Sequence, residues 1–326
     1  MSVQISFIVI GRNEAATILR SLASVFCAAS AAQLPSYEAI YVDSDSTDGS
    51  VSMVREQYGD SVRVIRLTGI RNAGIARNVG ASVATGKILF FIDGDMEVDS
   101  AFLGRVLDAR HELVHPVVTG RLPEMIYDVE RRVVARAADR RQIRKQEYRA
   151  SLGGVFLIDR AIFESVGGFA PELRVNEDLD LGLRLARAGT RTLALPYPIA
   201  LHHTVEYFDW TRIISMIRDG SMLYPGAIFR RHFFNPHYLP IFLSHQRPTI
   251  VLLISLLLAS LINPAWLAVY VGYVGAKNLR RPNVSLVQDV LGTTARSICF
   301  MVGLLTFFPR SVSPGSITYA VANESA

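Results

Sequence analysis

Through its first 200 residues, the chain alternates short apolar runs with segments in which apolar residues recur at helical spacing. The segments at 18–26 and 50–58 have the helical pattern. The apolar runs are too short for helices and rich in Ile, Val and Phe, so they predict buried strands. They occupy residues 5–10, 39–43, 62–67 and 88–92. This order predicts an α/β fold with a parallel sheet and right-handed crossovers.

The pattern continues to about residue 205 with further predicted elements. Residues 128–149 are rich in arginine, and we expect one long, charged helix there. A second helix is expected from Asn176, as its N-cap, to a stop at Gly189. Additional strands are predicted at residues 117–121, 152–158 and 192–195.

Carboxylates follow the predicted strands of the N-terminal half. Asp93 and Asp95 flank Gly94 directly after the strand at 88–92, and further acids are Glu14, Asp43 and Asp45. Ligands of open α/β sheets bind at the carboxyl ends of the strands. We expect Gly94 to let the backbone turn so that both neighbouring carboxylates converge on one cation. Such hard oxygen ligands suit Mg²⁺ or Mn²⁺ carrying a phosphate.

The segment at 69–80 offers a complementary positive charge. It contains Arg71 and Arg77 beside three glycines that permit close backbone approach, which suits a phosphate. A helix start with an exposed arginine is the alternative interpretation of this segment. The chain has neither a G-x-G-x-x-G sequence after its first strand nor a Walker loop, so the commonest nucleotide-binding signatures are absent.

The composition of the chain indicates association with a membrane. Half of the 326 residues are hydrophobic, only 19% are charged, and the mean hydropathy is positive. The net charge of +5 is dispersed over several arginine pairs, so we expect anionic lipid or phosphate partners and no nucleic acid. Cys27 and Cys299 are expected to be reduced packing residues. The first residues lack the pattern of a signal peptide, so we expect the chain to start in the cytosol.

The composition changes at residue 206. Residues 206–247 interleave aromatic and arginine residues, as in amphipathic helices at a membrane interface, and residues 248–310 are strongly apolar. The run at 250–276 is long enough to cross a bilayer, but Asn263-Pro264 interrupts it and positive charge flanks both ends. This favours a re-entrant hairpin over a span.

Two shorter segments complete the C-terminal part. The run at 298–308 is too short to cross a bilayer alone unless it is extended through Arg296, so we expect it to be interfacial or a second shallow hairpin. Residues 311–326 are expected to form a polar, frayed tail.

Five motifs occur in one order over residues 3–204. They are Phe7-Ile-Val-Ile-Gly-Arg-Asn-Glu14, Val42-Asp-Ser-Asp-Ser-Thr-Asp-Gly49, Asn72-Ala-Gly-Ile-Ala-Arg-Asn-Val-Gly80, Asp93-Gly-Asp95 and Asn176-Glu-Asp178. Together they resemble the family 2 inverting glycosyltransferases of GT-A fold, of the membrane-associated bacterial type. The resemblance implies a mixed, mainly parallel Rossmann-like sheet in a catalytic domain at 1–205.

The resemblance also implies an enzyme that takes a nucleotide-diphosphate sugar, with a UDP-sugar as the expected donor. Its donor site would include Glu14, Asp43, Asp45, Arg71, Arg77 and Asp93. Mg²⁺ or Mn²⁺ would bind Asp93 and Asp95. His203 would complete the coordination, with a hydrogen-bonded structural histidine as the alternative. The resemblance favours Asp178 as general base over Glu177 and Asp180, and Gly153, Gly154 and Glu177 are expected near the acceptor.

Proximity of the apolar segment favours a lipid-linked or surface-polysaccharide acceptor at the cytoplasmic face of the bacterial inner membrane. A polyprenyl-phosphate sugar synthase and a non-catalytic membrane adaptor that retains the fold are the alternatives. A processive polysaccharide synthase is a further enzymatic rival, but the chain lacks its Q-x-x-R-W acceptor motif.

Overall fold

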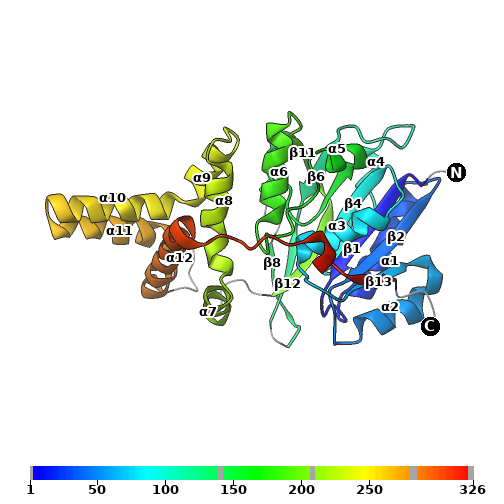
Figure 1. The fold of residues 1–326 in the computed structure, drawn as a ribbon, viewed down its shortest axis with the longest axis horizontal. Helices are drawn as coiled ribbons and strands as arrows, with labels where there is room; N and C mark the ends of the chain where they lie inside the picture. Colours follow the sequence, from blue (N-terminus) through cyan, green and yellow to red (C-terminus); the bar gives the residue numbers. More distant parts are fainter. Residues whose placement is uncertain (1–2, 129, 138–141, 206–209, 280–284, 322–326) are drawn as a thin grey trace. The chain divides into compact units, whose positions relative to one another are not determined.

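The computed structural model describes residues 3–128, 130–137, 142–205, 210–279 and 285–321. The chain divides into two compact units, here called the catalytic unit and the helical unit. The catalytic unit is Met1–Tyr207 together with Ser311–Ala326, and the helical unit is Phe208–Arg310 (Figure 1). The arginines expected to add positive charge at 140, 141, 280 and 281 lie outside the described residues.

A nine-stranded mixed sheet forms the centre of the catalytic unit, and the predicted α/β fold class is confirmed. Its strand order is β13-β3-β2-β1-β4-β10-β6-β11-β9. β3, β2, β1 and β4 are parallel neighbours, whereas β10 runs antiparallel to both β4 and β6. The strands are β1 (Ile5–Gly11), β2 (Tyr37–Asp43), β3 (Arg63–Leu67), β4 (Ile88–Asp93), β6 (Val117–Arg121), β9 (Glu147–Arg149), β10 (Phe156–Asp159), β11 (Thr192–Pro198) and β13 (Tyr319–Val321).

Helices cover both faces of this sheet, which explains the continuous apolar runs in the sequence. In β4, Phe90 and Ile92 belong to one core cluster, while Leu89 and Phe91 belong to the other. The first cluster is completed by α1 (Ile18–Ala31), α2 (Ser50–Tyr58) and α4 (Leu103–Val106). The second is completed by α3 (Ala73–Val83), α5 (Arg160–Ser165) and α6 (Glu177–Arg187).

The parallel strands define where a ligand can bind. From β1 the chain proceeds to β2 on one side, and β4 pairs with β1 on the other side. The two crossover helices therefore lie on opposite faces, and a crevice opens beyond the carboxyl ends of β1 and β4. Both acidic segments, Glu14 after β1 and Asp93 to Asp95 after β4, lie at this topological switch point.

A smaller four-stranded sheet corrects one prediction. Its order is β5-β12-β7-β8, with β5 (Met96–Val98), β12 (Ala200–Val205), β7 (Glu124–Tyr127) and β8 (Val133–Ala137). The long helix predicted at 128–149 is wrong, because the described part of this segment forms a hairpin with β7 and the strand β9. Its turn is closed by the Asp128 carbonyl and side chain, which accept from Arg131 and Arg132. The segment has no apolar helical stripe, so strand pairing overrides its helical propensity.

The tail after Arg310 also differs from our expectation. Instead of fraying, it forms a short 3₁₀ turn, Pro314–Ser316, and then β13 at the edge of the large sheet. Val312, Ile317 and Val321 pack against the second core cluster. These apolar residues alternate with polar ones, so the composition alone concealed the strand.

The helical unit contains α7 (Trp210–Arg218), α8 (Tyr224–His232), α9 (Tyr238–His245), α10 (Arg247–Leu261), α11 (Leu267–Asn278) and α12 (Leu286–Thr306). The apolar run at 250–276 forms two helices, α10 and α11, which pack against each other and against α12. The break lies at the expected Asn263-Pro264, where the Asn263 side chain accepts from the amide of Ala265.

The run at 298–308 is the second half of α12, a 21-residue helix that extends through Arg296. In the described part of the chain, α12 is the one helix long and apolar enough to cross a membrane. A second candidate arises if α9 and α10, bent by 65°, count as one span.

The helical unit has buried apolar side chains, such as Tyr270, Val274 and Phe300, but α10 and α12 also bury polar ones. The buried side chains of α10 are Thr249 and Ser255, and those of α12 include Asp289, Thr293 and Ser297. The exposed side chains are large and apolar, among them Leu253, Ile254, Leu257, Leu261, Ile262, Leu291, Ile298 and Leu305. In water such an arrangement leaves an apolar surface uncovered.

Candidate active site

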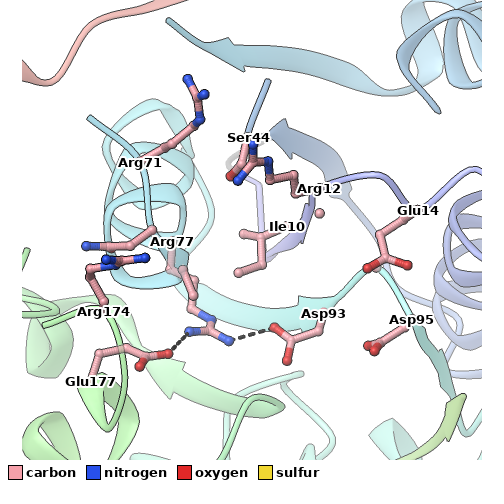
Figure 2. Close-up of a pocket in the computed structure, with 14 residues that line it drawn as sticks. Ile10, Arg12, Glu14, Ser44, Arg71, Arg77, Asp93, Asp95, Arg174 and Glu177 are labelled. Atoms are coloured by element: carbon pink, nitrogen blue, oxygen red, sulfur yellow. Dashed lines mark hydrogen bonds and ion pairs between the residues drawn. The ribbon is translucent and has the colours of Figure 1, made fainter. Parts of the chain in front are cut away.

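A cavity of about 470 Å³ opens at the switch point of the large sheet. Its floor is acidic and its walls carry arginines, as Figure 2 shows. It is lined by Ile10, Gly11, Arg12, Glu14, Ser44, Arg71, Asn72, Ala73, Arg77, Asp93, Gly94, Asp95, Arg174 and Glu177.

Asp93 and Asp95 meet at the floor because the chain turns sharply after β4. The Gly94 amide donates to the Ile10 carbonyl at 2.7 Å, which holds this turn against β1. Gly94 has no positive φ, so the reason for glycine differs from the one we expected. A Cβ there would lie 3.1 Å from the Ile10 carbonyl oxygen and 3.3 Å from Cγ of Glu14. Glycine allows close approach of two strands rather than an unusual dihedral angle.

Asp95 keeps one oxygen available. Its Oδ2 lies 3.1 Å from Nε2 of His202, whereas its Oδ1 is buried and has no hydrogen-bond partner among the described residues. An unsatisfied buried carboxylate oxygen is costly unless a proton or cation occupies it. Together with Asp93 it offers the oxygen ligands that Mg²⁺ and Mn²⁺ prefer, so the residues fit such a metal.

The described residues contain no cluster of three or more His, Cys, Asp or Glu side chains arranged to hold a metal by themselves. A magnesium-like ion is often bound by one or two carboxylates, with the substrate phosphates supplying further ligands. The two aspartates therefore make a partial site that a phosphate ligand would complete.

The structure places the ring of His203, the histidine expected at this metal, against Glu97 and Tyr127 rather than against the two aspartates. His202 and His203 are successive residues of β12, so their side chains point to opposite faces. His203 lies 2.6 Å from Oε1 of Glu97 and 2.8 Å from the Tyr127 hydroxyl. His202 instead contacts Asp95 with Nε2 and Glu124 with Nδ1. One residue of strand register decides which ring faces the metal carboxylates.

The pKa values of the two histidines are shifted in opposite directions. Burial opposes protonation of His202, but hydrogen bonds to Asp95 and Glu124 outweigh it and raise the pKa of His202. Burial lowers the pKa of His203, although Glu97 acts in the opposite direction.

Glu14 lines the cavity beside Gly94 and the two aspartates. Burial, with repulsion from the Asp95 carboxylate, raises the pKa of Glu14 to about 7. Its Oε2 accepts a 2.9 Å hydrogen bond from the Thr17 hydroxyl, which fixes the side chain at the entrance of α1.

Arg77 occupies a different position from the one expected for a phosphate ligand. Its side chain is 3% exposed, and its guanidinium bridges two carboxylates, Oδ1 of Asp93 at 2.6 Å and Oε1 of Glu177 at 2.8 Å (Figure 2). It also lies 5.3 Å from the ring centroid of Phe169. This Asp93–Arg77–Glu177 bridge joins the end of β4 to the first turn of α6.

The bridge also accounts for Glu177 and Gly154, which we expected beside the acceptor. Glu177 is buried and holds Arg77. At Gly154, a Cβ would lie 2.2 Å from Oδ2 of Asp93. Gly154 thus makes room for the aspartate, while its neighbour Gly153 has a φ of +78° that allows the turn. Neither Gly153 nor Gly154 lines the cavity.

Asp43 and Asp45 lie behind the cavity wall and do not line it. Asp43 is fully buried and accepts from the Tyr41 hydroxyl and the Ser46 amide, each at 3.0 Å. Asp45, with a positive φ of 61°, pairs with Arg66 at 3.1 Å and Arg71 at 3.0 Å. In this structure both acids organise the loop after β2.

Asp178 follows Glu177 in the first turn of α6. Among the described residues no hydrogen bond or ion pair engages its carboxylate. Asp180 is fully buried and paired with Arg184 at 2.8 Å. Of the three acids in this turn, Asp178 is thus the one without a charged partner among the described residues, although it does not line the cavity as Glu177 does. The turn begins at Asn176, whose φ is +65° and whose side chain, contrary to expectation, makes no capping hydrogen bond.

Two cavity arginines were missed by the sequence reasoning. Arg12 follows β1 inside the first motif, and Arg174 lies two residues before Asn176. With Arg71 they place three guanidinium groups around an acidic floor (Figure 2). Each lies beside a motif we had identified, but a lone arginine in a loop carries no signal of its own.

Comparison with known proteins agrees with this architecture. Polypeptide N-acetylgalactosaminyltransferase 6 of mouse is 28% identical over 232 residues, and its human counterpart is 28% identical over 230 residues. Each alignment covers 60% of this chain, which spans 37% of the length of these curated relatives. A mannosyltransferase from Pyrobaculum calidifontis, solved with GDP-Man and Mn²⁺, has a TM-score of 0.56 at 19% identity, covering 94% of this chain and 88% of that one.

The family model of glycosyl transferase family 2 matches residues 6–170, just over half of the chain. This range contains β1, the acidic turn after β4 and the Arg77 helix, and it ends before α6. The predicted family is confirmed: the chain belongs to glycosyl transferase family 2 and has the GT-A fold.

Proposed function

We propose that the chain transfers a sugar from a nucleotide-diphosphate donor, with a UDP-sugar as first candidate, to a hydroxyl of an acceptor. The observation that carries this proposal is the buried, unpartnered Oδ1 of Asp95 beside Asp93 at the switch-point cavity. The curated relatives are named as N-acetylgalactosaminyltransferases, and the Pyrobaculum structure holds GDP-Man and Mn²⁺. These names support a nucleotide sugar and a divalent metal as ligands.

We assign different parts of donor binding to the acidic and the basic residues of the cavity. Asp93 and Asp95 would hold Mg²⁺ or Mn²⁺, which when bound supplies charge stabilisation for the departing diphosphate. Arg12, Arg71 and Arg174 supply positive charge from the walls. Arg77 keeps Asp93 in place and is itself neutralised by two carboxylates, so it acts on the donor only through Asp93.

Direct displacement at the anomeric carbon needs a carboxylate that accepts the proton of the acceptor hydroxyl. Glu177 is held by Arg77 and Asp180 by Arg184, which leaves Asp178 as the base. Displacement assisted by a single base inverts the anomeric configuration. We therefore propose an inverting reaction.

Calorimetric titration of the purified chain in detergent tests the donor. UDP, GDP and dTDP are each added with Mn²⁺ and with EDTA. Tight, metal-dependent binding of one nucleotide supports the proposal, and Asp95→Ala should abolish the metal dependence. Absence of binding by all three nucleotides would favour a non-catalytic adaptor.

The base is tested by Asp178→Asn, which should abolish turnover while the nucleotide dissociation constant stays unchanged. Glu164→Gln, an exposed acid on α5, is the matched control and should keep full turnover. Product analysis by NMR reports the anomeric configuration, and retention would overturn the inverting mechanism even if transfer occurs.

We further propose that the helical unit binds a bilayer, at the cytoplasmic face of the bacterial inner membrane, and that the acceptor is lipid-linked or a surface polysaccharide. Support comes from the exposed apolar and buried polar side chains of this unit. At ~1.5 Å per residue, α10 and α11 reach only about 22 Å and 18 Å, shorter than the ~30 Å hydrocarbon core. A hairpin that enters and leaves by one face fits these lengths.

Membrane binding is tested by flotation with vesicles of phosphatidylethanolamine and phosphatidylglycerol. Leu261 and Ile262 at the hairpin tip are 73% and 67% exposed. Changing both to Asp should move the chain out of the vesicle fraction, since each acid costs about 2.5–3.5 kcal/mol in hydrocarbon. Val114→Asp, at a 54% exposed apolar site of the catalytic unit, is the control. Unchanged flotation of the hairpin variant would contradict the proposal.

A further inference from the structure

The C-terminal segment returns to the catalytic unit at a point close to the cavity. β13 adds to the free edge of β3 in antiparallel orientation, with Tyr319 opposite Leu67 and Val321 opposite Ile65 (Figure 1). The residues from Ser311 to Val321, here called the strap, lie outside the range 6–170 that matches the family. Nothing in the motifs of the N-terminal half anticipates this contact.

The strap holds the loop that follows β3. The amides of Thr68 and Gly69 donate to the Thr318 carbonyl at 2.9 and 3.3 Å, and the Ile70 amide donates to the Ser316 carbonyl at 3.4 Å. The Thr68 hydroxyl adds a 3.0 Å bond to the hydroxyl of Thr318. Three successive backbone donors of this loop are thus satisfied by the strap.

Gly69 is fitted to this contact. A Cβ at this position would lie 2.6 Å from the Ser316 carbonyl oxygen and 2.7 Å from Oγ1 of Thr318. A non-bonded Cβ does not come this close to an oxygen without a shift, and the Ser316 carbonyl belongs to the backbone. Any larger residue at 69 therefore displaces either the strap or the loop.

The same loop leads into the cavity wall. Arg71 and Asn72 follow Ile70 directly, and both line the cavity. Arg71 is fixed on one side by Asp45, at 3.0 Å. Asn72 caps α3 through its Oδ1, which accepts from Ile75 at 2.7 Å. The strap supplies the support between β3 and these two fixed points.

We propose that the strap contributes to donor binding by fixing the loop at residues 68–70. This loop positions Arg71 where the diphosphate of the donor binds. This rests on the proposed function and deepens it. Without the strap, the loop would have to be ordered at the moment of binding, and that ordering cost would weaken donor affinity. The carboxylates of the floor do not contact the strap, so the chemical step itself should be preserved.

The test alters each partner of the contact between the strap and the loop in turn, in the otherwise complete chain purified in detergent. Gly69→Ala blocks the strap from the loop side, and deletion of residues 311–326 removes it. Gly315→Ala is the matched control, because a Cβ there meets nothing within 4 Å. UDP and GDP with Mn²⁺ are the probes, and hydrogen exchange of the amides at 68–70 reports whether the strap is released.

We expect Gly69→Ala and the deletion each to raise the nucleotide dissociation constant about tenfold, equivalent to ~1.4 kcal/mol. Turnover at saturating donor should stay within about twofold of the parent, as for a loss of binding alone. A peptide of residues 311–326 added to the deleted chain should restore affinity. Gly315→Ala should bind as the parent does.

Two results would overturn the inference. In the first, the amides at 68–70 exchange rapidly in either variant while nucleotide affinity is unchanged, so the strap only covers a sheet edge. In the second, turnover at saturating donor falls as far as affinity does, so the effect is a general loss of structure. A parent chain that binds neither nucleotide would overturn the proposed function, and this inference with it.

Discussion

Arg77→Met removes the cation from the Asp93–Arg77–Glu177 bridge while keeping a side chain of similar length. Both carboxylates then remain in place without a partner. Removing one member of a buried ion pair costs about 3–5 kcal/mol. The side chain of Asp93 is 30% exposed and that of Glu177 is 12% exposed, so water relieves part of the penalty. We therefore expect a loss of about 3 kcal/mol in the free energy of unfolding of the catalytic unit.

The loss should depend on pH, with a sign set by the carboxylates. Burial raises the pKa of Asp93 and of Glu177, and Arg77 counteracts this in both. In Arg77→Met the counteracting cation is absent, so both pKa values rise further. A protonated carboxyl needs no cation, and the deficit should be largest near pH ~8 and shrink as pH falls towards ~5.

Urea unfolding in detergent, followed by far-ultraviolet circular dichroism, measures this effect. Tryptophan fluorescence is unsuitable, because Trp210 and Trp266 both lie in the helical unit. Adding Glu177→Gln to the Arg77→Met variant removes one unpaired charge and should recover part of the stability. A deficit below about 1 kcal/mol, or one that is the same at both pH values, would refute the reasoning.

Three further predictions concern single side chains. Gly154→Ala places a Cβ against Oδ2 of Asp93 and should weaken Mn²⁺ affinity about 10–100-fold in a titration, whereas Gly104→Ala, in open space, should have no effect; equal affinities would contradict the geometry. Asn72→Ala removes the cap of α3 and the 2.7 Å bond to the Pro171 carbonyl, and should lower the urea midpoint by the equivalent of ~1 kcal/mol. Asn72→Ser is the control that retains the cap alone. Glu38→Gln should cost ~1 kcal/mol at neutral pH, because burial disfavours the Glu38 carboxylate but hydrogen bonds from Ser6 and Thr85 outweigh it and hold its pKa below 4.5. That stabilisation is fully present above the ordinary pKa and lost as pH falls through the lowered one, so parent and variant should converge in acid, and a gap that widens there would contradict the assignment.

The central strands of the large sheet were predictable because they are buried on both faces, and burial leaves a continuous apolar signal. β4 illustrates this: its five apolar residues alternate between the two core clusters, and its end at Asp93 was evident from the sequence. The helix at 128–149 was misjudged because its strands are short, mostly exposed and rich in charge. Their pairing with β7 and β11 is a tertiary property that no local pattern encodes.

The sequence predicted which acidic residues lie at the candidate site. It predicted less well which contacts the neighbouring side chains make. Asp93, Asp95 and Glu14 stand where strand ends place them. The choice between His203 and His202 depends on one residue of register, and the sequence does not state which face of β12 turns inward. Arg77 was taken for a phosphate ligand because the sequence contains no information that Asp93 and Glu177, 16 and 100 residues away, converge on it.

The strap also has a consequence for the order in which the chain folds. Thr68 and Thr318, which it joins, are separated by 250 residues, and the whole helical unit lies between them. During synthesis the edge of β3 therefore stays open until the helical unit has been made. Closing so large a loop comes late, because non-local contacts are made only after the entropy of closure has been overcome. An open strand edge in that interval is a site of mispairing, so conditions that delay the folding of the helical unit should favour aggregation of this chain.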